Sequence, residues 1–241
     1  MKKLSKNLSR KILAGLIAVM LILGVAHLSL QYLNINYFNE ESGVFFELTN
    51  RFDFDDEASV PTWVSQLLFL LISASSALLV ALEKIKARKG LWLTVSIAAL
   101  VGSLDEVATL HENILQSLHL LFFDESSPTV LANAWLIVAP FVLIALFIFI
   151  YKAVSLLPKK TLKLIVIAAF LYISGAVFID IITSSTPTDI ASEKFMNQGI
   201  LVAIEELLEL AGLSIMLYTT IDYIESKFSS KIKRAINELL K

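Results

Sequence analysis

The chain has 241 residues, of which 56% are hydrophobic, and its formal net charge is −2. Its mean hydropathy of +0.74 and its long apolar runs exclude an ordinary soluble domain and indicate an integral membrane protein. It contains no cysteine, which excludes disulfides, thiolate metal sites and cysteine nucleophiles.

The apolar segments predict an all-α, polytopic membrane protein: one domain over residues 1–241, built as a six-transmembrane-helix bundle. Each segment is long enough to cross a hydrocarbon core of about 30 Å. The runs are continuous instead of alternating, which favours helices over a transmembrane β-barrel. The six expected spans are Ile12–Leu33, Thr62–Leu82, Leu91–Ile114, Val130–Tyr151, Leu162–Thr183 and Gly199–Ile221.

Lysine and arginine predict the orientation of these spans. Eighteen of the 20 basic residues lie in the N-terminal segment, the second and fourth connections and the C-terminal tail. Because basic residues accumulate in cytoplasmic segments, we expect both termini to be cytoplasmic, which requires an even number of spans. The first span is too long for a signal peptide and lacks a small-residue cleavage site, so we expect it to be retained. The expected location is a cell inner or plasma membrane.

Two segments outside the spans have a distinct character. The external connection Asn34–Pro61 is acidic and rich in phenylalanine, and we expect it to lie on the membrane surface or to fold back over the bundle. Residues 222–241 form a basic tail, which predicts an amphipathic helix at the cytoplasmic surface.

The predicted spans contain acidic residues but no lysine or arginine in their interiors. An acid at the centre of a membrane helix costs about 2.5–3.5 kcal/mol, and such residues usually mark function. Without a basic partner, each must be protonated, hydrated in a cavity or neutralised by a cation. The seven acids are Asp105, Glu106, Glu112, Asp180, Glu205, Glu206 and Glu209.

All seven acids fall in the outer half of the predicted bundle, on its third, fifth and sixth spans. Asp105 and Glu112 are seven residues apart and share a helical face, whereas Glu106 and His111 lie on flanking faces unless a frayed end intervenes. Glu205 and Glu209 also share a face, which Gly212 continues, and we expect another helix to approach closely there.

Carboxylates with one histidine suit a hard or borderline divalent metal ion of unspecified identity. The spacing matches neither the Glu-x-x-His pattern of bundle di-metal sites nor HExxH. Two alternatives stay open: a proton or ion pathway, and hydrogen-bonded carboxylates that only hold helices together. The predicted metal ligands are Asp105, His111, Glu112, Glu205 and Glu209, and the predicted supporting groups or general bases are Glu106, Glu206 and Asp180.

The other histidines and the acidic connection are secondary candidates. His27 is expected to be a packed or interfacial residue near the outer end of the first span, and His119 an interfacial one. The acidic connection leads into the second span at the level of the acids, so Asp55, Glu57 or Ser65 lie within reach of them.

The patches "FDFDDEASVPTWVS", "SLDEVATLHE" and "EELLELAG" together resemble a family of uncharacterised bacterial multi-pass membrane proteins. The chain is more loosely similar to membrane hydrolases of the alkaline ceramidase type, which hold zinc among histidines. It lacks the several intramembrane histidines of that pattern.

These observations lead to three functional hypotheses. The first is a metal-dependent membrane enzyme acting on a lipid or small amphiphile that arrives from the outer leaflet. The second is a cation- or proton-coupled transporter or channel subunit, and the third a structural subunit of a membrane complex. Nucleic-acid binding has no support, because topology already explains the basic cytoplasmic face.

Overall fold

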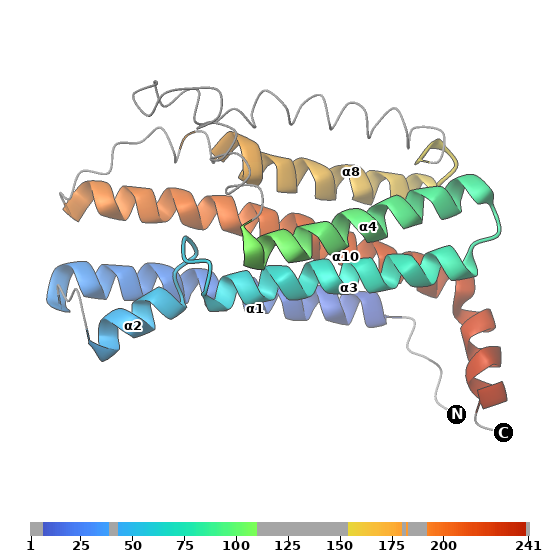
Figure 1. The fold of residues 1–241 in the computed structure, drawn as a ribbon, viewed down its shortest axis with the longest axis horizontal. Helices are drawn as coiled ribbons and strands as arrows, with labels where there is room; N and C mark the ends of the chain where they lie inside the picture. Colours follow the sequence, from blue (N-terminus) through green and yellow to red (C-terminus); the bar gives the residue numbers. More distant parts are fainter. Residues whose placement is uncertain (1–6, 39–42, 110–153, 180–181, 183–191, 240–241) are drawn as a thin grey trace.

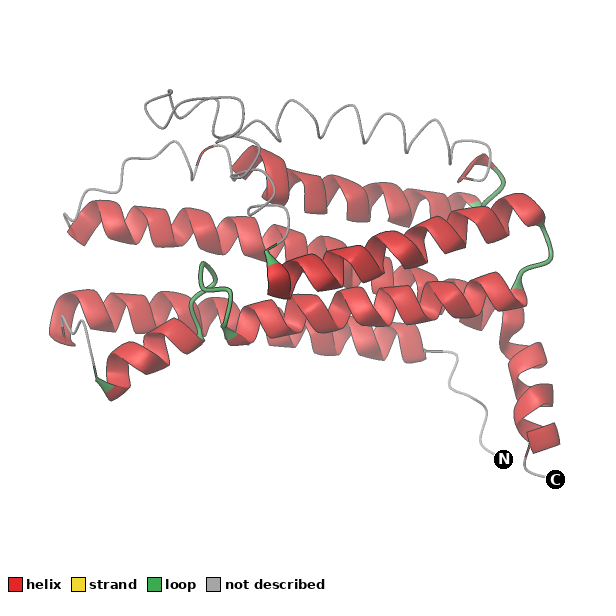
Figure 2. Ribbon diagram, viewed as in Figure 1, coloured by secondary structure: helices red, strands yellow, loops and turns green. Residues whose placement is uncertain are grey.

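The structure is a computed structural model that describes residues 7–38, 43–109, 154–179, 182 and 192–239. In these ranges all regular secondary structure is helical (Figure 2), which confirms the all-α class for this part of the chain. Four helices are long and apolar enough to cross a membrane: Leu8–Phe38, Val60–Leu82, Lys86–Ala108 and Lys159–Ile179.

These four helices correspond to the first, second, third and fifth predicted spans. The fourth predicted span, Val130–Tyr151, lies outside the described residues. The sixth, Gly199–Ile221, falls within α10 (Ser192–Leu239), a helix of 48 residues that is not one of the four. The prediction of six spans therefore stays a prediction.

The first two spans begin close to their predicted limits. α1 (Leu8–Leu33) runs on into a π-helical turn, η1 (Asn34–Phe38). α3 (Val60–Leu82) begins where Ser59 caps the helix by accepting the backbone N–H of Thr62. The short helix α2 (Val44–Arg51) lies between them.

The third span, α4 (Lys86–Ala108), ends before the predicted limit at Ile114. Thr109 has a left-handed backbone (φ 43°), and its N–H bonds to the Asp105 carbonyl at 2.7 Å, which closes the last turn. This helix therefore ends at Ala108, and residues 110–114 of the predicted span lie outside the described residues. The helical-phase argument relating Asp105 to Glu112 does not apply beyond Ala108.

The remaining helices are α8 (Lys159–Ile173), its π-helical continuation η2 (Ser174–Ile179), and α10. Figure 1 shows the long helices lying side by side along one common direction. α10 packs against α1, α3 and α8, while α4 packs mainly against α3. The long C-terminal helix is therefore the centre of the described bundle.

Small polar side chains join the helices of the bundle. Ser73 on α3 and Ser96 on α4 each donate their hydroxyl to the backbone carbonyl of the other, at 2.8 and 2.9 Å. Ser75 on α3 and Thr220 on α10 exchange a hydroxyl hydrogen bond at 2.8 Å. Such contacts stabilise helix pairs in lipid, where apolar surface alone gives little preference for a protein partner.

Buried apolar side chains form two clusters along the bundle. The larger one includes Leu68, Leu210 and Leu217, and it also contains Phe54, which comes from the acidic connection between α2 and α3. The smaller one surrounds Trp92, which is fully buried. Because Phe54 is 4% exposed and belongs to the larger cluster, this part of the connection packs against the bundle.

Candidate functional site

Four of the predicted acids meet between α4 and α10; we call Glu106, Glu205, Glu206 and Glu209 the carboxylate cluster. The charge of Glu106 on α4 acts on both Glu206 and Glu209 of α10. Glu205 acts on the same two residues. All four side chains are partly buried. The predicted convergence of acids from the third and sixth spans is therefore present for these residues.

The buried face of α4 explains why Glu106 reaches the cluster. Ser96, Ala99 and Ser103 are the buried residues of its second half, spaced three and four residues apart. Glu106 follows Ser103 by three residues and extends the same helical face. The sequence alone directed attention to the pair Asp105 and Glu112, whereas burial identifies the face that carries Glu106.

η2 and α8 pack closely against α10 beside the carboxylate cluster. A Cβ atom on Gly175 would lie 2.6 Å from the Glu205 carbonyl and 2.8 Å from Glu209 Cγ. A Cβ atom on Gly212 would lie 2.8 Å from the backbone of Ala168. The expected close approach of another helix at Gly212 is confirmed, because only glycine leaves room for backbone at these distances.

Tyr172 on α8 is a member of the site that the sequence analysis missed. Its side chain hydrogen-bonds Glu209, and the charges of Glu106 and Glu206 act on it. Its ring contacts Phe69 of α3 edge to face, with the ring centroids 5.9 Å apart. The available signal was its position three residues before Gly175 in the same predicted span.

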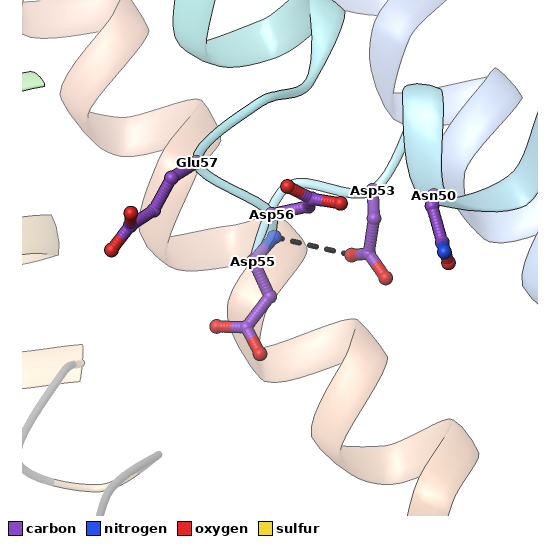
Figure 3. Close-up of a pocket in the computed structure, with 5 residues that line it drawn as sticks. All are labelled: Asn50, Asp53, Asp55, Asp56 and Glu57. Atoms are coloured by element: carbon purple, nitrogen blue, oxygen red, sulfur yellow. Dashed lines mark hydrogen bonds between the residues drawn. The ribbon is translucent and has the colours of Figure 1, made fainter. Parts of the chain in front are cut away.

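The acidic loop, residues 52–59, approaches the cluster from outside the helices. The charge of Asp55 acts on Glu206, as expected for the outer end of the second span. An open pocket of about 430 Å³ lies on this loop (Figure 3) and is lined by Asn50, Asp53, Asp55, Asp56 and Glu57.

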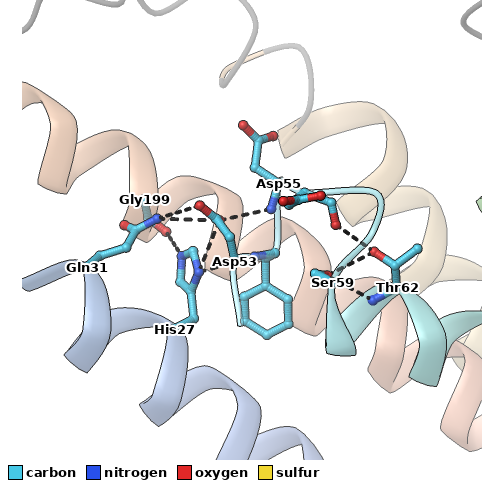
Figure 4. A network of polar contacts seen from close by, with 9 residues as sticks. His27, Gln31, Asp53, Asp55, Ser59, Thr62 and Gly199 are labelled. Atoms are coloured by element: carbon cyan, nitrogen blue, oxygen red, sulfur yellow. Dashed lines mark hydrogen bonds and ion pairs between the residues drawn. The ribbon is translucent and has the colours of Figure 1, made fainter. Parts of the chain in front are cut away.

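His27 attaches the acidic loop to α1 and α10 (Figure 4). It is 1% exposed, so the expectation of a packed histidine is confirmed. Its Nε2 lies 3.1 Å from the Gly199 carbonyl oxygen, and its Nδ1 accepts the Phe54 backbone N–H at 3.2 Å. Asp53 Oδ1 lies 3.3 Å from the same Nδ1.

Asp53 is held as an anion by its neighbours. Burial disfavours its charge, but the hydrogen bond and charge of His27 and the Asp55 backbone N–H outweigh burial, so the pKa of Asp53 is lowered from 3.8. Gln31 of α1 contributes through its amide, whose nitrogen lies 3.5 Å from both carboxylate oxygens.

The other predicted site residues are placed as follows. Asp105 is half-buried in the last turn of α4, where its carbonyl accepts the Thr109 N–H. Within the described residues, no group of three or more histidine, aspartate or glutamate side chains is arranged to hold a metal ion. The predicted residues outside the described part are His111, Glu112, Asp180 and His119.

The charges that act within the carboxylate cluster all have the same sign. In the described part of the chain, every charged side chain that acts on Glu206 or Glu209 is another carboxylate. Like charges that act on one another oppose simultaneous ionisation unless protons or a cation compensate them. The arrangement can therefore bind positive charge.

The fold and the site define a helical protein with four membrane-length helices and an acidic cluster among its helices. The chain belongs to the family described as a domain of unknown function (DUF8692), which matches residues 13–223. This agrees with the resemblance to an uncharacterised family. No curated protein and no solved structure matches the chain, and the looser similarity to alkaline ceramidases stays an expectation.

Proposed function

We propose that the chain is a multi-pass protein of a cell inner or plasma membrane whose carboxylate cluster binds a divalent metal ion. The supporting observation is that Glu106 of α4 acts on Glu206 and Glu209 of α10, while only carboxylates supply charge to those two residues in the described part. Oxygen ligands of this kind suit hard cations. Asp105, His111, Glu112, Glu205 and Glu209 are the proposed ligands.

The proposed activity is metal-dependent chemistry on a lipid or small amphiphile that enters from the outer leaflet. A bound cation supplies the charge that favours hydroxide formation from a water molecule. Glu106, Glu206 and Asp180 are the proposed groups that accept the proton or orient the ligands. Membrane lipid is the expected partner, because the apolar faces of the long helices are exposed.

Metal binding is tested on purified protein with substitutions that keep side-chain size. Glu205→Gln and Glu209→Gln should each remove bound metal measured by elemental analysis, because each replaces an anionic ligand with a neutral amide. Glu47→Gln is the matched control, since Glu47 is exposed on α2. Well-folded wild-type protein that binds none of Mn²⁺, Zn²⁺, Mg²⁺ or Ca²⁺ in equilibrium dialysis would contradict the proposal.

A second candidate is cation- or proton-coupled transport, favoured by one further observation. The charge of Asp55, which is exposed on the acidic loop, acts on Glu206 within the cluster, linking the aqueous surface to the membrane carboxylates. Transport predicts ion or proton flux in proteoliposomes that Glu206→Gln abolishes and Glu47→Gln leaves unchanged. Absence of flux under any imposed gradient would reject this candidate.

A further inference from the structure

A hydrogen-bond donor and a hydrogen-bond acceptor both lie beside the same ring nitrogen of His27. The Phe54 backbone N–H, a donor, points at Nδ1 from 3.2 Å. Asp53 Oδ1, an acceptor, lies 3.3 Å from the same atom. On the other side of the ring, Nε2 faces the Gly199 carbonyl oxygen at 3.1 Å. His27 therefore contacts two elements that are far apart in sequence, the acidic loop and α10.

The protonation state of the ring decides which of the two loop groups it binds. Neutral His27 with its proton on Nε2 donates to Gly199 and accepts from Phe54, which satisfies both buried backbone groups. A protonated ring donates from both nitrogens. Its Nδ1–H would then face the Phe54 N–H, which loses its acceptor, while the ring gains a charge-assisted contact with Asp53.

The acidic loop is tied together internally, so a change at residues 53 and 54 is carried to Asp55. The Asp55 N–H bonds to Asp53 Oδ1 at 3.1 Å, and the Ala58 N–H bonds to Asp56 Oδ1 at 2.8 Å. Arg51 donates to the Ala58 carbonyl from the end of α2. Asp55 is also the loop residue whose charge acts on Glu206.

We propose that His27 is a buried proton-binding residue whose protonation exchanges its Phe54 N–H bond for Asp53 and thereby repositions the acidic loop beside the carboxylate cluster. In the described part of the chain, Asp53 is the charged side chain that contacts His27. α10 presents the Gly199 carbonyl to it, and Gln31 on α1 contacts Asp53. Any effect of the repositioned loop on cation binding by the cluster rests on the proposed function. The exchange of hydrogen-bond partners at His27 does not.

Hydrogen exchange at the Phe54 amide tests the exchange of partners. Between about pH 8 and pH 5, where imidazole changes charge, protection corrected for intrinsic exchange should fall about tenfold in wild-type protein. His27→Asn should abolish this pH dependence, because its side-chain oxygen can accept the amide but cannot be protonated. Asp53→Asn should weaken the pH dependence, since it removes the carboxylate that the protonated ring gains as its partner.

Two results would overturn the proposal. One is Phe54 protection that does not change with pH in wild-type protein, and the other is a change that persists undiminished in both variants. If His27→Asn fails to fold, the pH dependence of Phe54 protection in Asp53→Asn still tests the proposal. Metal affinity measured across the same pH range separates the two proposals: a Phe54 transition without any metal binding would retain the His27 exchange and reject the proposed function.

Discussion

At the scale of single residues, a carboxylate in the described structure accepts hydrogen bonds from the first backbone N–H groups of a helix. Glu225 on α10 accepts the backbone N–H of Leu8 at 3.0 Å and of Ser9 at 3.4 Å, and it also accepts the Ser9 hydroxyl at 2.7 Å. These are the first N–H groups of α1, which have no partner within their own helix. Glu225 therefore caps a helix that begins more than 200 residues earlier in the chain.

Removing this cap should destabilise the contact between α1 and α10. We expect Glu225→Ala to lower the free energy of unfolding by about 1–2 kcal/mol, because it deletes both a cap and a negative charge at a helix N-terminus. Unfolding in detergent, followed by circular dichroism, measures this. Asp222→Ala is the control: its partner Lys160 is 60% exposed, and such ion pairs contribute about 0–1 kcal/mol. Equal losses in the two variants would contradict the capping role.

Asp53 should make the free energy of unfolding depend on pH in the acidic range. Its pKa in the folded chain is lower than its ordinary value of 3.8, so its ionised form stabilises the fold fully above that value. The contribution is lost as the pH falls below 3.8 through the folded-state pKa. Denaturation measured from pH 6 down to pH 2.5 should therefore show a smaller acid-dependent loss in Asp53→Asn, and Glu47→Gln should behave as wild type.

At the scale of helices, the position of the site depends on how closely α8 and α10 pack. Gly175 on η2 faces Glu205 and Glu209 of α10, and Gly212 on α10 faces Ala168 and Tyr172 of α8. Between them lies Tyr172, which binds Glu209. The helix contact and the carboxylate site are therefore parts of one interface, and a change in the spacing of the two helices alters both.

A methyl group at Gly212 should separate these helices. Its Cβ would lie 2.8 Å from the Ala168 carbonyl oxygen and 2.8 Å from Tyr172 N, and neither backbone atom can move aside independently. We expect Gly212→Ala to cost about 1–3 kcal/mol in unfolding free energy. Gly15→Ala on α1 is the matched control, because nothing lies within 4 Å of its added methyl group and helix propensity favours alanine. A neutral effect at Gly212 would reject the close packing.

The helices were predictable to different degrees for identifiable physical reasons. Apolar length located α1, α3, α4 and α8. The end of α4 was missed because Thr109 terminates the helix through a left-handed backbone, and threonine gives no sequence signal for that conformation. Glu106 was assigned a supporting role because its helical face was inferred from Asp105 and Glu112, whereas the side chains packed between α4 and α3 decide which face is buried.

At the scale of the whole molecule, the described basic segments gather at one end of the bundle. α1 begins and α10 ends at the end of the bundle where α3 connects to α4 (Figure 1). Lys84 lies in that connection, and Lys86, Arg88 and Lys89 lie in the first turns of α4. The acidic loop precedes α3 and so lies at the other end of this helix. This separation of charge supports the predicted cytoplasmic location of both termini.

The cysteine-free chain allows a direct test of this orientation. Glu57→Cys and Lys89→Cys each introduce one thiol at an exposed position. A membrane-impermeant thiol reagent should label the first in intact cells and the second only after lysis. The reverse pattern would invert the topology, and labelling of both in intact cells would reject α3 as a membrane-crossing helix.

The uninterrupted course of α10 has a mechanical consequence. Glu209 at the cluster and Tyr223 toward the basic end belong to the same helix, about 21 Å apart along its axis at 1.5 Å per residue. Tyr223 donates its hydroxyl to the buried Glu83 at the end of α3. A rotation of this helix that turns Glu209 must also turn Tyr223, so a movement at the carboxylate cluster is coupled by torsion to the Tyr223–Glu83 contact near the basic end of the bundle.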